Sequence, residues 1–186
     1  RMDWMRDVAD SAERDLRFAC HAEEVISSWS TVYAAAGAEI SKLADLDGRR
    51  VALLAGSVQR RVFENMAAGF GYEVSIVEAD SYLDAFALTA AGGADAVISN
   101  YLFGNYFYQD FGLERTSVVF NPVSLHYATA EGMNADLLVA IDRNLVRMKA
   151  SAGSAYYKVL GTWMDRPPRP VVPRYLRLAL GVIGLL

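Results

Sequence analysis

The residues best suited to chemistry stand where an apolar run meets a glycine and a serine, in the segment VALLAGSVQ that ends at Gln59. Gly56 lets a ligand approach the backbone closely, and Ser57 adds a hydroxyl. A helix that begins at Val58 would present free N–H groups that attract an anion. The spacing fits neither a P-loop, a G-x-G-x-x-G fingerprint nor a G-x-S-x-G elbow. The segment is therefore either an anion-binding cradle or an ordinary strand-to-helix turn.

Other reactive side chains form no recognisable catalytic or metal-binding pattern in the sequence. His21 and His126 are far apart, and Cys20, the single cysteine, offers neither a disulfide nor a redox motif. Glu23 and Glu24 are adjacent, so their side chains point apart and make a poor acid/base pair. We therefore expect structural roles for the histidines, no enzymatic activity, no metal and no cofactor.

Aromatic side chains offer further candidates for contact with a ligand. Trp29 and Tyr33 lie in the strand-like segment EEVISSWSTVYA, where either ring could stack on a small molecule. The cluster YLFGNYFYQDF could line a pocket, but its helical spacing favours packing in a core.

Strand-like and helix-like segments alternate between Arg49 and Phe120, and these elements must position the candidate residues. Short apolar runs predict strands at residues 51–54, 74–77 and 96–99, with a fourth in TSVVF. Helical patterns separate them in VQRRVFENMAAGF, in SYLDAFALTAAGG with its Ser-x-x-Asp cap, and in NYLFGNYFYQDFG. The alternation predicts right-handed βαβ units on a parallel sheet, which bind ligands at the carboxyl ends of the strands.

Two helical patterns follow the alternating region. Residues 134–150 form a clear amphipathic pattern, and SAYYKVLGTWM predicts a shorter helix. We expect the longer helix to lie outside the core of the sheet, beside the segment around Arg14.

Composition sets limits on function and size. The chain has 186 residues, of which 53% are hydrophobic and 22% charged, so it can form one domain or two small lobes. A net charge of −4 argues against a general nucleic-acid-binding protein, because there is no basic field to neutralise phosphates.

The C-terminal region has a different composition. The segment RPPRPVVP holds four of the five prolines and predicts an extended linker. Residues 178–186 carry no charge, although a complete membrane-spanning helix needs about 20 apolar residues. We expect the start of a transmembrane helix in a fragment of a longer protein; the alternative is a hydrophobic tail that docks on the domain.

Several segments together resemble one protein family. LADLDGRRVALLAGSVQRRVF resembles the start of the second lobe in the amino-acid-type (family 3) periplasmic solute-binding proteins. DSAERDLRFACHAEEVISSWSTVYA is similar to the end of their first lobe and the strand that crosses between lobes. AAGGADAVISN, NPVSLHYATAEG and LLVAIDRNLVRMKASAGSAYYKVLGTWM are similar to later strands and closing helices. The resemblance covers residues 7–164, lacks most of the first lobe, and is greatest to versions fused to bacterial membrane sensors of the histidine kinase or diguanylate cyclase type.

The resemblance implies an α/β fold of the type 2 periplasmic-binding-protein kind, with a parallel-sheet second lobe and a remnant of the first lobe. The implied divisions are 1–33 for the end of the first lobe and the crossover, 34–122 for the second lobe, 123–164 for the return strand and closing helices, 165–174 for the proline-rich linker, and 175–186 for the start of the transmembrane helix.

The resemblance also implies ligand-binding residues. Arg14 matches the family's carboxylate-binding arginine, and Ser57 with the N–H groups of Val58 and Gln59 matches the carboxylate cradle of the second lobe. Val58 replaces the common threonine, which removes one hydroxyl contact. Asn100 replaces the aspartate that holds an ammonium group, which weakens charge pairing with an α-amino acid, and it is equally suited to cap the following helix. Trp29 completes the set as a residue near the hinge.

These implications lead to one expected function and two alternatives. The expected function is that of an extracytoplasmic solute-sensing domain, anchored in the inner membrane by its C-terminal segment and belonging to a signal-transduction protein. Its expected partners are an amino acid or small carboxylate, the membrane, and a second copy in a homodimer, but no nucleic acid. The first alternative is the binding protein of an ABC-type amino-acid uptake system, and the more distant alternative is a dehydratase-like enzyme.

Overall fold

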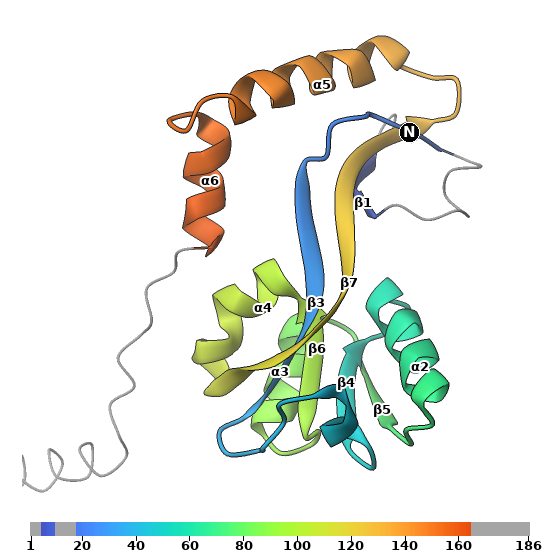
Figure 1. Cartoon of the computed structure of the whole chain (residues 1–186), viewed down its shortest axis with the longest axis vertical. Coiled ribbons are helices and arrows are strands. Elements are labelled where there is room, and N and C mark those ends of the chain that lie inside the picture. The colour runs from blue at the N-terminus through green and yellow to red at the C-terminus, as the bar shows by residue number, and fades with distance from the viewer. Residues whose placement is uncertain (1–4, 10–17, 165–186) are drawn as a thin grey trace, which may run out of the picture.

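The computed structural model describes residues 5–9 and 18–164, which form two parts joined by a pair of long strands (Figure 1). One part, which we call the sheet lobe, contains β4, β5 and β6 with helices α2, α3 and α4. The other, which we call the upper part, contains β1, β2, α5 and α6. Strands β3 (Ile26–Ala35) and β7 (Leu113–Ala130) run through both parts.

The sheet lobe is built around three parallel strands. β4 (Arg50–Leu54) lies between β5 (Ser75–Ala79) and β6 (Ala96–Asn100) and pairs parallel with both. The strands predicted from the sequence are thus confirmed to within two residues at each end. The connecting helices are α2 (Val58–Phe70), α3 (Tyr82–Ala90) and α4 (Tyr101–Phe107), and two short 3-10 helices lie at η1 (Leu43–Leu46) and η2 (Tyr108–Phe111).

The remaining strands are antiparallel to their neighbours. The sheet order is β1-β7-β3-β6-β4-β5, and β2 (Phe18–Cys20) also pairs with β7, as does β1 (Met5–Ala9). The prediction of a fourth strand in the parallel set at residues 116–120 is wrong, because these residues belong to β7 and pair antiparallel with β3. β3 precedes the alternating region in the chain, but it inserts between β6 and β7.

Capping residues fix the starts of the helices. Ser57 ends an extended segment, and its hydroxyl accepts a hydrogen bond from the N–H of Arg60 at 3.2 Å. Ser81 does the same for the N–H of Asp84 at 3.1 Å, which confirms the Ser-x-x-Asp cap predicted from the sequence. α2 ends at Gly71, whose φ of 74° requires the left-handed conformation that glycine adopts readily.

Both faces of the sheet are buried, because neighbouring residues of a strand point to opposite sides. One core contains Val32, Val51 and Leu53 with Phe63 of α2. The other contains Tyr33, Ala52 and Val97 with Phe86 of α3. The two helices therefore cover opposite faces of the sheet.

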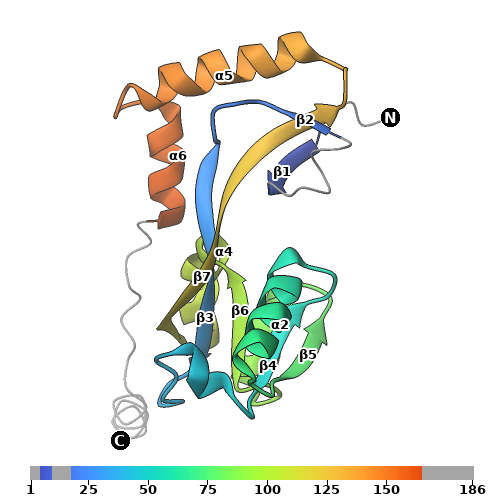
Figure 2. The same cartoon turned by 45° about the vertical axis from the view of Figure 1, so that its right-hand side comes forward.

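Helices α5 (Ala135–Lys149) and α6 (Ala155–Met164) lie outside the core of the sheet lobe (Figure 2). Asp142 of α5 accepts hydrogen bonds from Nδ1 of His21 at 3.0 Å and from the N–H groups of Ala22 at 3.1 Å and Glu23 at 2.8 Å. The predicted position of this helix outside the sheet is confirmed. The segment around Arg14, beside which we also expected it, lies outside the described residues.

Within residues 5–9 and 18–164, no helix has the length and apolar character needed to cross a bilayer. The predicted linker at 165–174 and the predicted transmembrane segment at 175–186 lie outside the described residues. Both therefore stay predictions.

Candidate functional site

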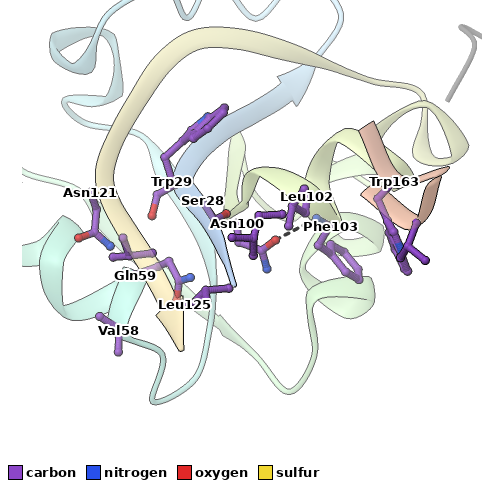
Figure 3. Close-up of a pocket in the computed structure, with 14 residues that line it drawn as sticks. Ser28, Trp29, Val58, Gln59, Asn100, Leu102, Phe103, Asn121, Leu125 and Trp163 are labelled. Carbon is purple, nitrogen blue, oxygen red and sulfur yellow. Dashed lines mark hydrogen bonds between the residues drawn. The ribbon is translucent and has the colours of Figure 1, made fainter. Parts of the chain in front are cut away.

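A cavity of about 690 Å³ lies where β3 and β7 leave the sheet lobe (Figure 3). Its walls come from these two strands, from the first residues of α2 and α4, and from α6. Its volume lies within the range of small-molecule sites in proteins. The lining residues are Ile26, Ser28, Trp29, Ser30, Val58, Gln59, Asn100, Leu102, Phe103, Asn121, Val123, Leu125, Val159 and Trp163.

The structure places four of the six predicted site residues in this cavity: Trp29, Val58, Gln59 and Asn100. They come from β3, from the first turn of α2 and from the end of β6, elements that are well separated along the chain. The cavity thus lies at the carboxyl end of the parallel strands, where ligands bind in open α/β sheets. Contact of these residues with a ligand stays a prediction.

Ser57 is not among the described residues that line the cavity. Ser57 precedes Val58, but its hydroxyl is used as the N-cap of α2. Arg14 lies outside the described residues. The anion-binding cradle predicted at Ser57 would therefore be formed by the first N–H groups of α2, which have no partner within the helix.

Asn100 caps a helix and also lines the cavity. Its Oδ1 accepts a hydrogen bond from the N–H of Phe103 at 2.9 Å and so caps α4. Burial raises the pKa of the neighbouring Tyr82, and a side-chain hydrogen bond with Asn100 partly offsets this rise. Asn100 is therefore held in place by its own helix and by Tyr82 while it lines the cavity.

The two aromatic candidates have different positions. Trp29 is half-buried and stacks on Tyr101, with ring centroids 4.3 Å apart and planes inclined by 29°. This contact fixes the orientation of the indole at the cavity wall. Tyr33 is completely buried between Phe86 and Tyr108, so the expectation that it could stack on a ligand is wrong.

Sequence reasoning missed two serines in the floor of the cavity. Ser28 is 3% exposed and Ser30 is 1% exposed, and neither hydroxyl has a hydrogen-bond partner among the described residues. A buried polar group without a partner costs about 1–3 kcal/mol, so such groups are rare unless they serve a function. The signal that could have revealed them is SSWS in a buried strand, where β-branched and aromatic residues are usual.

A β-bulge beside the serines shapes the cavity further. Ser28 pairs with Val123 and Ser30 with Phe120, so two residues of β7 stand opposite Trp29 alone. One of them, Asn121, has a φ of 52°, in the left-handed region that few residues other than glycine adopt. Bulges redirect side chains near functional sites, and Asn121 lines the cavity.

The electrostatic character of the cavity is neutral on the described side. Its 14 lining residues include no aspartate, glutamate, lysine, arginine or histidine. The described residues also contain no group of three side chains able to hold a metal ion. The described lining residues provide hydroxyl and amide groups, a helix N-terminus and apolar surface. Such groups bind a molecule by hydrogen bonds and packing.

The two histidines, although far apart in sequence, lie together away from the cavity lining. Their ring centroids are 5.2 Å apart, and Nε2 of His21 accepts a hydrogen bond from the N–H of Tyr127 at 2.9 Å. Since Nε2 is an acceptor, Nδ1 carries the proton that His21 donates to Asp142. His21 thus joins α5 to β7, and Nδ1 of His126 lies 3.1 Å from the carbonyl oxygen of His21, so the contacts of both histidines are structural.

Comparison with known proteins identifies the same fold. The family model described as NMT1/THI5 like matches residues 5–144. No curated protein matches the chain significantly in sequence. Among solved structures, an ancestral arginine-binding protein bound to glutamine is similar to this chain with 24% identity and a TM-score of 0.68, covering 83% of this chain and 67% of that one.

Two further solved structures are similar. A histidine kinase sensor domain with similarity to periplasmic binding proteins has 21% identity and a TM-score of 0.72, covering 88% of this chain and 70% of that one. The probable amino-acid ABC transporter extracellular-binding protein from Bacillus subtilis has 16% identity and a TM-score of 0.74, covering 86% and 69%. The fold is therefore that of the periplasmic solute-binding proteins, as the sequence resemblance implied.

Proposed function

Because the chain belongs to the NMT1/THI5-like family, we propose that it is the extracytoplasmic solute-sensing domain of a membrane signal-transduction protein. It binds a small solute in the cavity between the sheet lobe and the upper part. The observation that carries this proposal is a pair of buried serines, Ser28 and Ser30, that line a cavity of ligand size. Their hydroxyls have no hydrogen-bond partner among the described residues.

The proposed binding mode places the polar end of the solute against the start of α2. The N–H groups of Val58 and Gln59 bind a carboxylate or a carbonyl oxygen, and Ser57 holds these groups in place as the helix cap. Asn100 and Trp29 contact the solute from β6 and β3. The family resemblance adds a contact between a carboxylate of the solute and Arg14.

The position of α6 supports a sensor over a protein that only delivers its ligand. Val159 and Trp163 of α6 line the cavity, and Asn105 of α4 donates a hydrogen bond to the carbonyl oxygen of Met164 at 3.3 Å. A solute in the cavity would thus contact the helix that leads directly into residues 165–186. A ligand shifts a conformational equilibrium only through such differential contacts.

A second candidate function is the binding protein of an ABC-type amino-acid uptake system, which the similarity to the Bacillus subtilis protein supports. Fractionation of cells that express the complete gene separates the two. A sensor stays in the membrane fraction after carbonate extraction and responds to solute through its own output module. Release of the native protein into the soluble periplasmic fraction would favour the uptake role.

We predict that Ser28→Ala and Ser30→Ala each stabilise the free protein while weakening ligand binding. Each substitution removes a buried hydroxyl without a partner, which should raise the free energy of unfolding by about 1 kcal/mol. Each also removes a hydrogen bond to the solute, which should lower affinity by roughly 2- to 13-fold for a neutral partner. Urea denaturation without ligand and calorimetric titration with ligand measure the two effects.

The matched control for the serine variants is Ser27→Ala on the same strand. The Ser27 side chain is exposed and donates to Glu24 at 2.9 Å, so its loss should change stability by less than about 0.5 kcal/mol and leave affinity unchanged. Serine variants at 28 and 30 that lose stability and keep full affinity would contradict the proposed site.

We predict that Arg14→Ala weakens carboxylate ligands selectively. A thermal-shift screen of the chain with amino acids and small carboxylates identifies the ligand, and titration with that ligand and with its primary amide measures the effect. Loss of a hydrogen bond to a charged group should lower carboxylate affinity by roughly 10- to 150-fold. Equal losses for acid and amide would contradict the role proposed for Arg14.

A further inference from the structure

A second, apolar cavity of about 340 Å³ adjoins the first. The two cavities share four lining residues: Ile26, Leu102, Val159 and Trp163. Beyond them the second cavity continues between α5 and α6, past Met148 and Leu160. We call it the apolar groove.

The apolar groove contains little that could hold a polar group. None of its nine lining residues is charged. The hydroxyl of Tyr156 is already used, because it donates to the carbonyl oxygen of Val25 at 2.9 Å. Burial raises the pKa of this tyrosine, so it stays neutral at physiological pH.

Two of the four apolar side chains that the two cavities share are exposed to an unusual degree. Val159 is 60% exposed and Trp163 is 43% exposed. Both lie on the side of α6 that lines the two cavities, so the exposed apolar surface is concave and continuous with the polar cavity. Scattered single exposed apolar residues need no explanation, but a continuous concave apolar surface is typical of a ligand site.

From this continuity we propose that the solute is an amphiphile, with a polar end in the main cavity and an alkyl or aryl end in the apolar groove. The proposal rests on the proposed function, because it assigns the chemical class of the same ligand. The polar end lies near Ser28, Ser30 and the start of α2, and the apolar end packs against Leu102, Val159 and Trp163. The apolar end is therefore the part of the solute that contacts α6.

The test is a series of N-acylglycines with acetyl, butanoyl and hexanoyl chains, each paired with its N-acylglycinamide. Calorimetric titration of the whole chain should show affinity rising by about fourfold for each added methylene, as expected for burial of apolar surface. The acid and amide series should show the same increment, because the increment comes from the tail. Affinity independent of tail length in a series whose acetyl member binds would overturn the inference and leave the proposed function intact.

Two tryptophan variants locate the tail. Ala155 is an exposed residue that lines the apolar groove, so Ala155→Trp should fill the groove and remove most of the gain of the hexanoyl over the acetyl compound. Lys158→Trp introduces the same side chain at an exposed position that is not among those lining either cavity, and it should leave the gain unchanged. Equal behaviour of the two variants would contradict a tail in the groove.

A probe without a polar end separates failure of this inference from failure of the proposed function. 1-Hexanol should shift the indole N–H resonance of Trp163, and Ala155→Trp should abolish this shift. If hexanol shifts the resonance but no acylglycine or acylglycinamide binds, the apolar site stands and the proposed polar contacts fail. If neither hexanol nor the hexanoyl compounds perturb Trp163, the inference is overturned.

Discussion

Gly104→Ala is expected to destabilise the protein by about 2–3 kcal/mol, although alanine is the better helix former by about 1 kcal/mol. Gly104 is the buried residue of α4, and a methyl group there would overlap the ring of Tyr33. The ring cannot move aside, because Tyr33 is completely buried and packs against Phe86 and Tyr108. The overpacking penalty therefore exceeds the gain in helix propensity.

Gly69→Ala provides the matched control for this prediction. Gly69 lies within α2, and an added methyl group would meet no atom within 4 Å. The same substitution should therefore stabilise the protein by about 0.5–1 kcal/mol, the ordinary difference between the two residues in a helix. Urea denaturation of both variants measures the opposite signs. A Gly104→Ala variant as stable as the parent would show that Tyr33 can leave its position.

Asp142→Ala is expected to lower the free energy of unfolding by about 3 kcal/mol, because it removes an acceptor that serves three donors. His21 is 3% exposed, and its Nδ1–H would be left without its partner. The N–H groups of Ala22 and Glu23 would also lose their acceptor. Asp142→Asn keeps one acceptor oxygen and should recover part of the loss.

The control for Asp142→Ala is the adjacent Arg143→Ala. Arg143 is exposed on α5, and its removal should change stability by less than about 0.5 kcal/mol. Chemical denaturation followed by circular dichroism measures both variants. An Asp142→Ala variant with the stability of Arg143→Ala would mean that α5 is not held by this carboxylate.

The contribution of Asp142 should depend on pH in a defined direction. Burial alone would raise the pKa of this carboxyl, but hydrogen bonds from Glu23, Ala22 and His21 outweigh burial and hold the pKa below its ordinary value. A group with a lowered folded-state pKa stabilises the protein above its unfolded pKa of about 4 and loses this effect as pH falls through the folded pKa. The difference between the parent and Asp142→Ala should therefore be constant from pH 7 to about 5 and shrink below about pH 4.

The local elements of the sheet lobe could be predicted from the sequence because their signals are local. Apolar runs identified β4, β5 and β6, a helical pattern from Val58 identified α2, and the cap at Ser81 marked the start of α3. The pairing of β7 with β3 could not be predicted from periodicity, since the two strands come from opposite ends of the alternating region. Periodicity identifies a strand but does not say which neighbour it has.

The residues of the candidate site also fall into two groups, those that sequence signals could identify and those that depend on contacts between distant segments. Gln59 follows a predicted strand, so the rule that ligands bind at the carboxyl ends of parallel strands pointed to it. Asn100 was predicted from the family resemblance. Asn121 lines the cavity because a bulge in β7 redirects it, and a bulge depends on the register between two distant strands. Val159 and Trp163 reach the cavity only because α6 folds back toward α4, with Trp163 packed on Tyr106 at 4.9 Å between ring centroids.

The serines of β3 occupy a strand that is at once the floor of the cavity and one of the strands joining the two parts of the molecule. Under the proposed function, ligand recognition and the connection between the two parts therefore depend on the same few residues. Substitutions at Ser28 or Ser30 that change the proposed ligand preference would also alter a strand that joins the two parts. Gln59 and Leu102 belong to elements that end within the sheet lobe. Under the proposed function, ligand preference could therefore diverge at these two positions, in nature or by engineering, without a change in the strands that join the two parts.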